Sequence, residues 1–447
     1  MSQSPETKRN ESRRSFLQAG SALTAGAVAA TTLPISRAAH TFSSDEIKIG
    51  LIGCGGRGTG AISDALSTHK EENRLKLTAV ADPFEYRAKG AINHVTKSNP
   101  SLIDIQDRQF IGLDGYKRLL DSDVDMVILT SPPGFRPQHF EAAIKAGKHV
   151  FMEKPVAVDA PGVRRVLEAN KLAKEKKLAV GVGLQRRHQA NYKATIAKLR
   201  DGAIGHINLT RCYWNMGDLW VRNREKEQTE LEYQIHNWYH FNWLSGDHIN
   251  EQHIHNLDVI NWLMDGHPVE AQGAGGRQVR TGKEYPQIFD HHFVEYTYGN
   301  GTKLFSQCRQ ISGCWNEVNE FAHGSNGWCD IGGGKIYDKD NKVIWQAPAS
   351  GAGYQQEHTD LFDLIRKGET NSGNEGDYGA TSTMTAIMGR MATYSGQKLS
   401  WDKCFNSNVS LANTDAMDDF GDEAPVKPDE DGRYWIPTVG QDADQVV

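Results

Sequence analysis

The feature that most constrains the fold is the stretch at residues 47–58, IKIGLIGCGGRG. Its apolar first half predicts a short buried strand, and the glycine pattern G-x-G-x-x-G follows at once. Between a strand and a helix, this pattern is typical of a loop that binds the pyrophosphate of a dinucleotide, because it allows a tight turn, a close backbone approach and close helix packing. The free amides at the start of the helix then face the anion. We therefore expect a Rossmann domain with cofactor contacts at Gly53, Gly55, Gly56, Arg57 and Gly58.

A carboxylate after the next strand indicates which dinucleotide is bound. Residues 75–80 predict that strand, and Asp82 stands at its end, 24 residues after Gly58. A carboxylate there accepts hydrogen bonds from a ribose diol and repels a 2′-phosphate. The sequence therefore favours NAD over NADP as the cofactor, and a doubly wound domain without a nucleotide is the alternative.

Residues 1–38 predict a segment that is not part of the fold. Residues 12–17 (SRRSFL) match the twin-arginine export signature, an apolar run follows at 19–33, and small residues precede Ala39. The apolar run is too short to span a bilayer as a stable helix. We expect recognition by the twin-arginine export machinery, a periplasmic or otherwise exported protein, and no stable membrane anchor. A disordered basic leader is the alternative.

Composition and charge exclude several classes of protein. The net charge of the 447 residues is -6, and no basic stripe suits a nucleic acid. The six cysteines lack C-x-x-C spacing, so we expect no metal cage of thiolates, and we interpret Cys54 as a small loop filler. His253 and His255 would point to different faces of a helix, which makes a poor chelate. We therefore expect no metal.

Two further strands are predicted at residues 125–130 and 149–152. Ser131 and Pro132 follow the first of them, and residues 153–155 (EKP) follow the second. In an open parallel sheet, the carboxyl ends of the strands border the ligand crevice. These two turns are therefore candidates for the cofactor site.

Several motifs together resemble the Gfo/Idh/MocA family, named for glucose–fructose oxidoreductase, inositol dehydrogenase and rhizopine catabolism. They are GLIGCGGRG, TSPPGFRPQH, AGKHVFMEKP, QRR at 185–187, DGAIGHI at 201–207, HNLD at 255–258 and SGQKLSWD at 395–402. The resemblance implies an α/β protein: an N-terminal Rossmann domain and a C-terminal α/β domain with a large, mostly antiparallel sheet that commonly forms homo-oligomer contacts. We place the signal peptide at 1–38, the Rossmann domain at 45–165, the substrate and oligomerisation domain at 166–413, and an acidic C-terminal arm at 414–447.

The resemblance also implies roles for individual residues. The E-K-P motif assigns Lys154 to catalysis, where it would hydrogen-bond the reacting hydroxyl and stabilise negative charge on it. An isolated lysine after a strand would otherwise be a surface residue. The same motifs imply cofactor contacts at Ser131, Pro132, His139, Glu153 and Lys154.

Glu251, His255 and Asp258 form a second candidate centre. Their spacings of four and three place all three on one face of a helix. A histidine with a pKa near neutrality can take the hydroxyl proton, and a carboxylate one turn away can orient the imidazole. Inositol-dehydrogenase-like members of the family have an aspartate four residues before this histidine, where this chain has Glu251. We expect His255 and Glu251 to be catalytic; a buried structural histidine is the alternative for His255.

The aromatic segment at residues 213–243 is consistent with carbohydrate binding. Aromatic rings stack on the CH faces of sugars, although such rings serve equally often as core or as an oligomer interface. We expect substrate contacts at Arg186, Trp214, Trp238 and Asp258.

Three functions fit these patterns. We favour an exported NAD(P)-dependent oxidoreductase that transfers a hydride between a sugar, polyol or sugar derivative and a tightly bound nicotinamide. The alternatives are a redox-neutral NAD-dependent glycosidase or lyase of the same superfamily, and a non-catalytic sugar-binding protein. Because little free NAD is available outside the cytoplasm, we expect slow cofactor release, with closure supplied by residues 213–243 or by the acidic arm.

Overall fold

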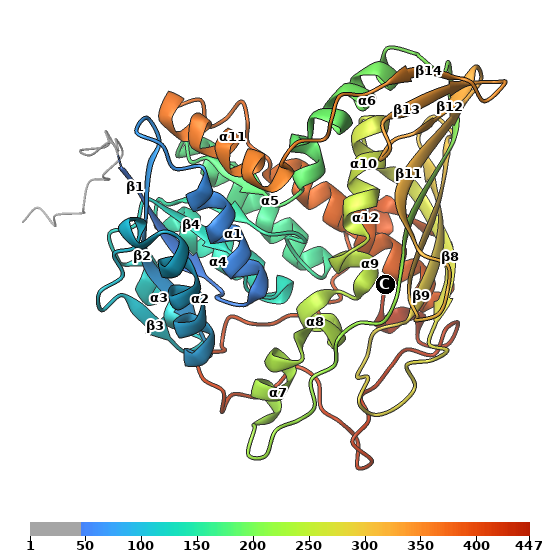
Figure 1. Ribbon diagram of the computed structural model, residues 1–447. Coiled ribbons are helices and arrows are strands. Elements are labelled where there is room, and N and C mark those ends of the chain that lie inside the picture. Colours follow the sequence, from blue (N-terminus) through green and yellow to red (C-terminus); the bar gives the residue numbers. More distant parts are fainter. Residues whose placement is uncertain (1–45) are drawn as a thin grey trace, which may run out of the picture. The chain divides into compact units, whose positions relative to one another are not determined.

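Six parallel strands form the first sheet, in the order β3-β2-β1-β4-β5-β6 (Figure 1). The strand order reverses between β1 and β4, which is the switch point where a Rossmann sheet binds its ligand. The strands are β1 (Glu46–Ile52), β2 (Arg74–Asp82), β3 (Gln109–Ile111), β4 (Met126–Leu129), β5 (His149–Met152) and β6 (Val180–Val182). The computed structural model describes residues 46–447, so the expected signal peptide lies outside the described residues.

The strands at the centre of this sheet are mostly apolar, with Glu46 and Lys48 at the start of β1 as exceptions. Every residue of β4 is buried, as expected for a parallel strand that is covered on both faces. The helices that connect the strands are α1 (Gly56–Ser67), α2 (Glu85–Ser98), α3 (Gly115–Leu120), α4 (Arg136–Lys145) and α5 (Ala160–Glu175). The expected Rossmann domain is therefore present.

The Rossmann sheet extends past residue 165, where the sequence analysis placed the domain boundary. That position lies within α5, and the strand that follows, β6, pairs in parallel with β5. Helix α5 is thus a crossover that returns the chain to the first sheet. The second domain begins only after β6.

The second sheet has nine strands, in the order β14-β13-β12-β11-β7-β10-β9-β8-β15. Only β7 and β10 pair in parallel among its described neighbours, so the expected large, mostly antiparallel sheet is confirmed. Its strands are β7 (Ile207–Met216), β8 (Pro268–Gly276), β9 (His291–Tyr298), β10 (Lys303–Gln310), β11 (Glu317–Gly324), β12 (Gly327–Asp330), β13 (Lys335–Asp338), β14 (Val343–Gln346) and β15 (Leu399–Ser400).

Helices cover one face of this second sheet. In Figure 1, α10 and α12 lie between the two sheets, and α12 packs on β8 and β9. The opposite face carries Phe293 and Phe305, which are 40% and 36% exposed. The helices of this part of the chain are α6 (Ala190–Arg200), α7 (Glu230–His236), α8 (Asn242–Ser245), α9 (His248–Glu251), α10 (Ile254–Met264), α11 (Gly353–Lys367), α12 (Gly376–Ser395) and α13 (Trp401–Phe405).

Helix α11 belongs to the second half of the sequence but packs on the first sheet. Its residues Leu361 and Phe362 share a buried cluster with Ile49 of β1 and Phe151 of β5. The two domains are therefore joined by a continuous hydrophobic contact as well as by the chain itself.

A separate buried cluster joins three distant parts of the chain. It combines Rossmann loop residues with residues 231–244 and with the C-terminal arm: Phe84, Leu113, Phe135, Leu231, Tyr233, Ile235, Phe241, Trp243, Leu244, Met417, Ala424 and Tyr434. The arm also pairs with the Rossmann domain, since Asp418 lies 2.6 Å from Lys117 and Asp415 lies 2.9 Å from Arg165. The C-terminal arm thus packs against both domains.

Within residues 46–447, no helix is both long enough and apolar enough to cross a membrane.

Candidate functional site

The glycine loop after β1 is shaped to receive an anion. Gly53 has φ +94°, and a Cβ on Gly58 would lie 2.0 Å from the carbonyl oxygen of Gly53, so only glycine fits at these two positions. A Cβ on Gly55 or Gly56 would meet no atom within 4 Å, so these two residues face open space. Gly55 is the N-cap of α1 and provides no side-chain cap, which leaves the first amides free. The loop therefore fits the pyrophosphate of a dinucleotide.

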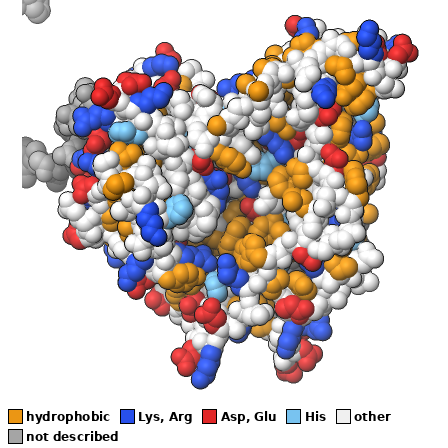
Figure 2. Space-filling model, in the orientation of Figure 1, with side chains coloured by type: hydrophobic (Ala, Val, Ile, Leu, Met, Phe, Trp, Pro, Cys, Tyr) orange, Lys and Arg blue, Asp and Glu red, His pale blue; other side chains and the backbone are white. Residues whose placement is uncertain are grey.

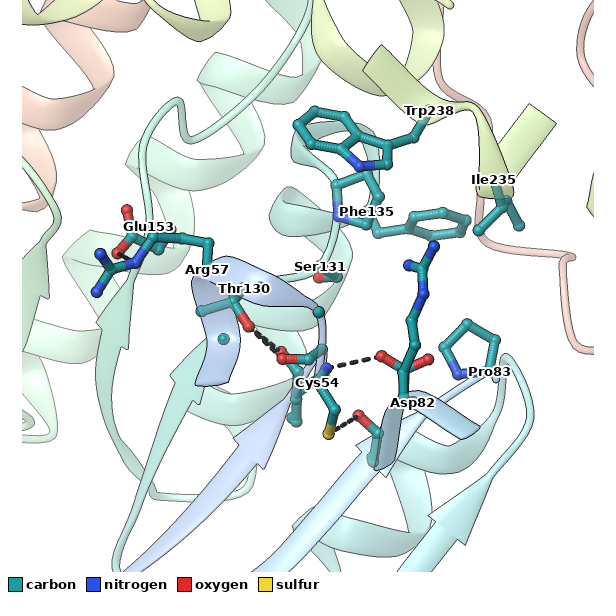
Figure 3. Close-up of a pocket in the computed structure, with 18 of the residues that line it drawn as sticks. Cys54, Arg57, Asp82, Pro83, Thr130, Ser131, Phe135, Glu153, Ile235 and Trp238 are labelled. Carbon is teal, nitrogen blue, oxygen red and sulfur yellow. Dashed lines mark hydrogen bonds and ion pairs between the residues drawn. The ribbon is translucent and has the colours of Figure 1, made fainter. Parts of the chain in front are cut away.

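Asp82 lies beside this loop and braces it. Its Oδ2 accepts a hydrogen bond from the Cys54 amide at 2.7 Å (Figure 3). Its Oδ1 accepts one from the Phe84 amide at 2.8 Å. Burial raises the pKa of the Asp82 carboxyl from its ordinary value. Each oxygen keeps a second lone pair, so the side chain can still accept from a ribose diol. Cys54 itself is buried, and its thiol donates to a backbone carbonyl, which fits a small loop filler.

A cavity of about 610 Å³ lies over the glycine loop. Figure 2 shows the hollowed face, where basic, histidine and hydrophobic side chains meet. Lys154, Glu251 and Trp238 line the cavity. So do all the residues expected to contact the cofactor: Gly53, Gly55, Gly56, Arg57, Gly58, Asp82, Ser131, Pro132, His139, Glu153 and Lys154.

A buried arginine holds the carboxyl ends of β4 and β5 together. Arg136 donates to the carbonyl of Ser131 and, at 2.7 Å, to the carbonyl of Pro155. Burial lowers the pKa of Arg136 to about 10, which leaves the guanidinium charged at neutral pH. His139 bonds Ser131 Oγ through Nδ1 at 2.9 Å, and burial lowers its pKa to about 3, so its imidazole is neutral.

Arg57 connects the glycine loop to the E-K-P turn. Its Nε lies 2.9 Å from Oε1 of Glu153, and its Nη2 lies 3.1 Å from Asp64. Its guanidinium also lies 4.9 Å above the ring of Tyr354. Figure 3 shows Arg57 and Glu153 together at one side of the loop. The ion pair fixes the orientation of the turn that carries Lys154.

Lys154 reaches from the end of β5 to the end of α9. Its Nζ lies 3.1 Å from Oε1 of Glu251 and also donates to the backbone carbonyl of Glu251. The side chains are 9% and 11% exposed, so water screens the pair weakly. The structure thus brings two of the three expected catalytic residues together in the wall of the cavity. A cation and a carboxylate in contact at such a place can hold and move a proton.

His255 lies near this pair but is not among the residues that line the cavity. Its ring stacks on Trp214 with the centroids 5.9 Å apart, and its Nδ1 has no hydrogen-bond partner among the described residues. Burial, together with the positive charges of Lys154 and Arg186, holds the pKa of His255 well below its ordinary value. The imidazole is therefore neutral, and it is a weaker base than the pKa near neutrality expected from the sequence would make it.

The single helical face expected for Glu251, His255 and Asp258 is wrong, because the helix is broken. Glu251 ends α9, and α10 begins at Ile254. Across the break, the His255 amide donates to the carbonyl of Gln252 at 3.3 Å, a tighter turn than an α-helix makes. The break leaves Glu251 at the cavity, while His255 and Asp258 belong to α10.

Asp258 is bound by protein groups. Arg187 donates to its two oxygens at 2.8 and 2.9 Å, and the Ser382 hydroxyl donates to it at 2.7 Å. The side chain is 1% exposed and does not line the cavity. This geometry corrects the expected substrate contact: the carboxylate instead joins α10 to α12 and to the turn after β6.

Arg186 and Trp214 also lie outside the cavity lining. Arg186 pairs with the fully buried Glu320, and its guanidinium lies 6.0 Å from the ring of Trp214. Of the four residues expected to contact substrate, Trp238 alone lines the cavity. The reason is that the other three are held by the second sheet and its helices.

Residues 217–244, here called the roof segment, supply the wall of the cavity away from the glycine loop. Trp220, Arg222, Ile235 and Trp238 line the cavity, and Figure 3 shows Trp238 and Ile235 on that side. The rings of Trp220 and Trp238 lie 6.1 Å apart at 60°. The Asn237 side chain accepts from the Arg222 amide at 2.9 Å, which fixes the fold of the segment.

Several lining residues were not foreseen from the sequence. They lie on loops and helix faces near the carboxyl ends of the strands: Tyr86, Arg87, Leu113, Tyr116, Phe135 and Arg136. No spacing pattern marks them. The available signal was their position shortly after predicted strands of a parallel sheet.

The first domain matches a known protein family. Residues 47–184 match the family model GFO_IDH_MocA, described as the oxidoreductase family with an NAD-binding Rossmann fold. The chain is 29% identical to inositol 2-dehydrogenase of Serratia proteamaculans over 219 residues, which is 48% of this chain. The matched part spans 57% of the length of that relative.

Solved structures share the fold of both domains. A scyllo-inositol dehydrogenase from Lactobacillus casei with bound NAD(H) and scyllo-inositol superposes with a TM-score of 0.60 at 18% identity, over 80% of this chain and 99% of that chain. An aldose-aldose oxidoreductase from Caulobacter crescentus gives a TM-score of 0.60 at 17% identity, over 79% and 99%. The α/β architecture of a Rossmann domain followed by an antiparallel-sheet domain is therefore shared with these structures.

Proposed function

We propose that this chain, whose NAD-binding domain is of the Gfo/Idh/MocA oxidoreductase type, is an exported NAD-dependent oxidoreductase of a sugar or polyol. The observation that carries the proposal is the contact between Lys154 and Glu251, 3.1 Å apart in the wall of the cavity above the glycine loop. An acid–base pair beside a nicotinamide site is what oxidation of a secondary alcohol requires. The inositol dehydrogenase relatives support a polyhydroxylated ring as the substrate class.

The residues divide the chemistry between them. A bound nicotinamide would supply the hydride acceptor. The Lys154 ammonium donates to the oxygen that loses its proton and stabilises the negative charge on it. Glu251 orients that ammonium. As Lys154 takes up the hydroxyl proton, it would release one of its own protons to the neutral imidazole of His255, so that the ammonium keeps its charge and the imidazole gains one.

The roof segment suits a carbohydrate. Trp220 is 41% exposed at the cavity, so one aromatic face is free for the CH face of a sugar ring. Trp238 stands beside it, and the Arg222 guanidinium lies 5.2 Å from the Trp220 ring. These side chains would select a ring-shaped substrate, and Arg222 would donate to its hydroxyls.

The same segment favours slow release of the cofactor. Its residues pack against Phe84, Leu113 and Phe135 of the Rossmann domain and against the C-terminal arm. Opening the cavity therefore requires this buried cluster to separate. An exported enzyme with a trapped dinucleotide would regenerate it on the protein, by reducing a second substrate after oxidising the first.

The proposal is tested on the mature protein after extensive dialysis. We expect NAD to co-purify and to be identified by its mass, and we expect oxidation of a panel of sugars and polyols, coupled to reduction of a second sugar, without added NAD. Activity that disappears on dialysis and returns with free NAD would show an exchanging dehydrogenase. No turnover of any sugar or polyol under either condition would contradict the oxidoreductase.

A redox-neutral glycosidase or lyase of the same superfamily is the second candidate, and the roof segment favours it as well. In such a reaction one substrate is oxidised and then reduced again, so a trapped cofactor is never exchanged. Glycoside cleavage without net oxidation of any sugar would identify this second reaction. The experiment above separates the two, because only the first yields an oxidised product.

We also propose that the outer face of the second sheet forms the interface of a homo-oligomer. Phe293 and Phe305 stand on neighbouring strands of that face, with ring centroids 6.1 Å apart, and both are partly exposed. Light scattering would measure the mass of the assembly. A monomer at micromolar concentration would contradict this arrangement.

A further inference from the structure

Three buried side chains outside the cavity converge in the second domain. Asp247 and His248 stand at the start of α9, and His292 stands in β9. Their potential ligand atoms all lie within 4.8 Å of one another, and none of the three residues is more than 3% exposed. A carboxylate and two imidazoles in a dry place require a cation, a proton or hydrogen-bond partners to be stable.

The hydrogen bond at Nδ1 of His292 determines whether Nε2 carries a proton or a lone pair. The hydroxyl of Thr393 donates to the carbonyls of Gly389 and Arg390 in its own helix, at 3.1 and 3.0 Å. Its oxygen therefore accepts from Nδ1 of His292, which lies 2.9 Å away. With the proton on Nδ1, Nε2 presents a lone pair. That lone pair lies 3.3 Å from Oδ2 of Asp247, so two electron-rich atoms face each other.

His248 has no hydrogen-bond partner on either ring nitrogen among the described residues. The residue is fully buried, and its Nε2 lies 3.8 Å from Oδ1 of Asp247. A second nitrogen is thus turned toward the same carboxylate without a partner. Buried polar atoms in folded proteins are almost always satisfied, so this one requires an explanation.

Asp247 is held firmly in this position. Its backbone has φ +74°, which is unusual for a residue other than glycine. Its Oδ2 accepts from the Tyr394 hydroxyl at 2.6 Å and from the Phe289 amide at 3.0 Å. Its Oδ1 accepts only the adjacent His248 amide among the described hydrogen bonds and keeps a lone pair for another partner.

We propose that Asp247, His248 and His292 bind a divalent transition-metal ion, with zinc as the best match. Zinc takes imidazole nitrogen and carboxylate oxygen at about 2.0–2.2 Å. In a tetrahedral site, neighbouring ligand atoms then lie roughly 3.3–3.5 Å apart. Nε2 of His292 lies 3.3 Å from Oδ2 of Asp247, which matches that spacing, and Nε2 of His248 lies 3.8 Å from the other oxygen, Oδ1. The bond from His292 Nδ1 to Thr393 is the outer-shell contact that metal-binding histidines usually make.

The ion would position the catalytic pair without touching the substrate. Asp247 and His248 begin the four-residue helix α9, and Glu251 ends it. Coordination by His292 would fasten this short helix to β9 of the second sheet. The carboxylate that orients Lys154 would then rest on a fixed support.

The sequence pattern alone disfavoured a metal, because His253 and His255 are expected on different faces of a helix. His292 lies far along the chain from His248, but the fold brings the two rings together, with their centroids 4.9 Å apart. The nearby charges of Arg280 and Asp290 are opposite in sign and act against each other at His248, and both act there more weakly than the charge of Asp247. The carboxylate of Asp247 thus remains the main attraction for a cation.

The test is the metal content of the tag-free mature protein, produced with zinc in the medium and dialysed against metal-free buffer. We expect about one zinc per chain by mass spectrometry, and its loss in His248→Ala and in His292→Ala. His358→Ala is the matched control, because His358 is also fully buried with both ring nitrogens unpaired, but it lies on α11. That variant should retain the metal.

If the histidine variants fail to fold, a second measurement on the wild-type protein tests the proposal. In wild-type protein grown with cobalt in place of zinc, paramagnetically shifted proton resonances should show two coordinated imidazoles. A wild-type protein without transition metal after growth in zinc, or metal retained by both histidine variants, would overturn the proposal. The first result would instead identify a buried ion pair between Asp247 and a protonated His292.

Discussion

The amine of Lys154 lies 3.1 Å from Oε1 of Glu251, and this contact joins residues 97 positions apart. It connects the end of a Rossmann strand to a short helix of the second domain. Because both side chains are mostly buried, the contact is screened only weakly and fixes the amine at the cavity. The proposed chemistry depends on this geometry.

Replacing the amine should remove most of the activity. Lys154→Ala should leave cofactor binding intact and lower kcat by at least ~10²-fold, the usual contribution of a positioned acid or base. Glu251→Gln should be milder and should shift the pH profile of kcat. The control is Lys148→Ala, since Lys148 is a partly buried lysine of the same domain whose amine donates only to the carbonyls of Ser122 and Val124 in the described structure. Near-normal turnover by Lys154→Ala would reject this role.

Asp82 should determine which dinucleotide is preferred. Asp82→Ala removes the acceptor for a ribose diol and the two bonds that brace the loop. NAD should bind at least tenfold more weakly, or ~1.4 kcal/mol, and the preference for NAD over NADP should fall. Titration calorimetry of cofactor-free protein measures both affinities. Asp107→Ala, an exposed change in the same domain, should alter neither. A wild type that prefers NADP would contradict the assignment.

The C-terminal arm should set the rate of cofactor release through its buried residue Tyr434 rather than through its charged side chains. Tyr434 is 7% exposed, donates to Glu230 at 2.5 Å and packs edge-on against Phe241. Tyr434→Ala should cost on the order of 3 kcal/mol of stability and speed the loss of NAD. Trp435→Ala changes a neighbouring aromatic that is 49% exposed and should do neither. Denaturant unfolding and stopped-flow release of NAD provide the readouts.

The acidic side chains of the C-terminal arm should contribute little to stability and to retention of the cofactor. The pairs of Asp418 with Lys117 and of Asp415 with Arg165 are largely exposed, and exposed ion pairs contribute about 0–1 kcal/mol. Asp415→Asn with Asp418→Asn should therefore lower the free energy of unfolding by no more than about 2 kcal/mol and leave the rate of NAD release within twofold of wild type. A large effect on either quantity would show that charge, and not the buried cluster, holds the C-terminal arm in place.

His188 should make stability fall at alkaline pH. It lies between Asp360 at 2.7 Å and Glu375 at 3.0 Å, and although burial opposes the charge, these carboxylates raise the pKa of His188 to about 9. A raised pKa in the folded state contributes stability that is fully present below about pH 6.5 and is lost as the pH rises through 9. The unfolding free energy should drop by on the order of 2 kcal/mol across that range. His188→Gln should flatten the dependence, whereas the exposed His206→Gln should leave it unchanged; equal slopes would contradict the ion pair.

Export should require both arginines of the leader. Arg13→Lys together with Arg14→Lys should leave an unprocessed protein in the cytoplasm, because the twin-arginine machinery reads the pair itself and not only its charge. Cell fractionation and the mass of the N-terminal peptide measure the outcome. The conservative exchange of the neighbouring pair, Lys8→Arg with Arg9→Lys, should be exported normally. Export of the first variant would show that the leader is read by another pathway.

Much of the cofactor site was predictable because its signals are local. A glycine pattern after a buried strand, a carboxylate at the end of the next strand and the E-K-P turn each occupy a few consecutive residues. The parallel sheet then brings these strand ends to one edge. All the residues expected to contact the cofactor accordingly line one cavity. The boundary at residue 165 was misplaced because α5 reads as a linker until β6 is known to pair with β5.

By itself, the sequence determined the Rossmann fold, the glycine loop and the position of Lys154, because backbone geometry and strand order follow from short-range patterns. Only the tertiary structure decided the rest. It broke the helix between Glu251 and His255, bound Asp258 to Arg187, and carried His292 to His248. It also packed the roof segment against the C-terminal arm. These contacts join residues far apart in the chain, and their partners are set by how whole elements bury their apolar faces, which no local spacing records.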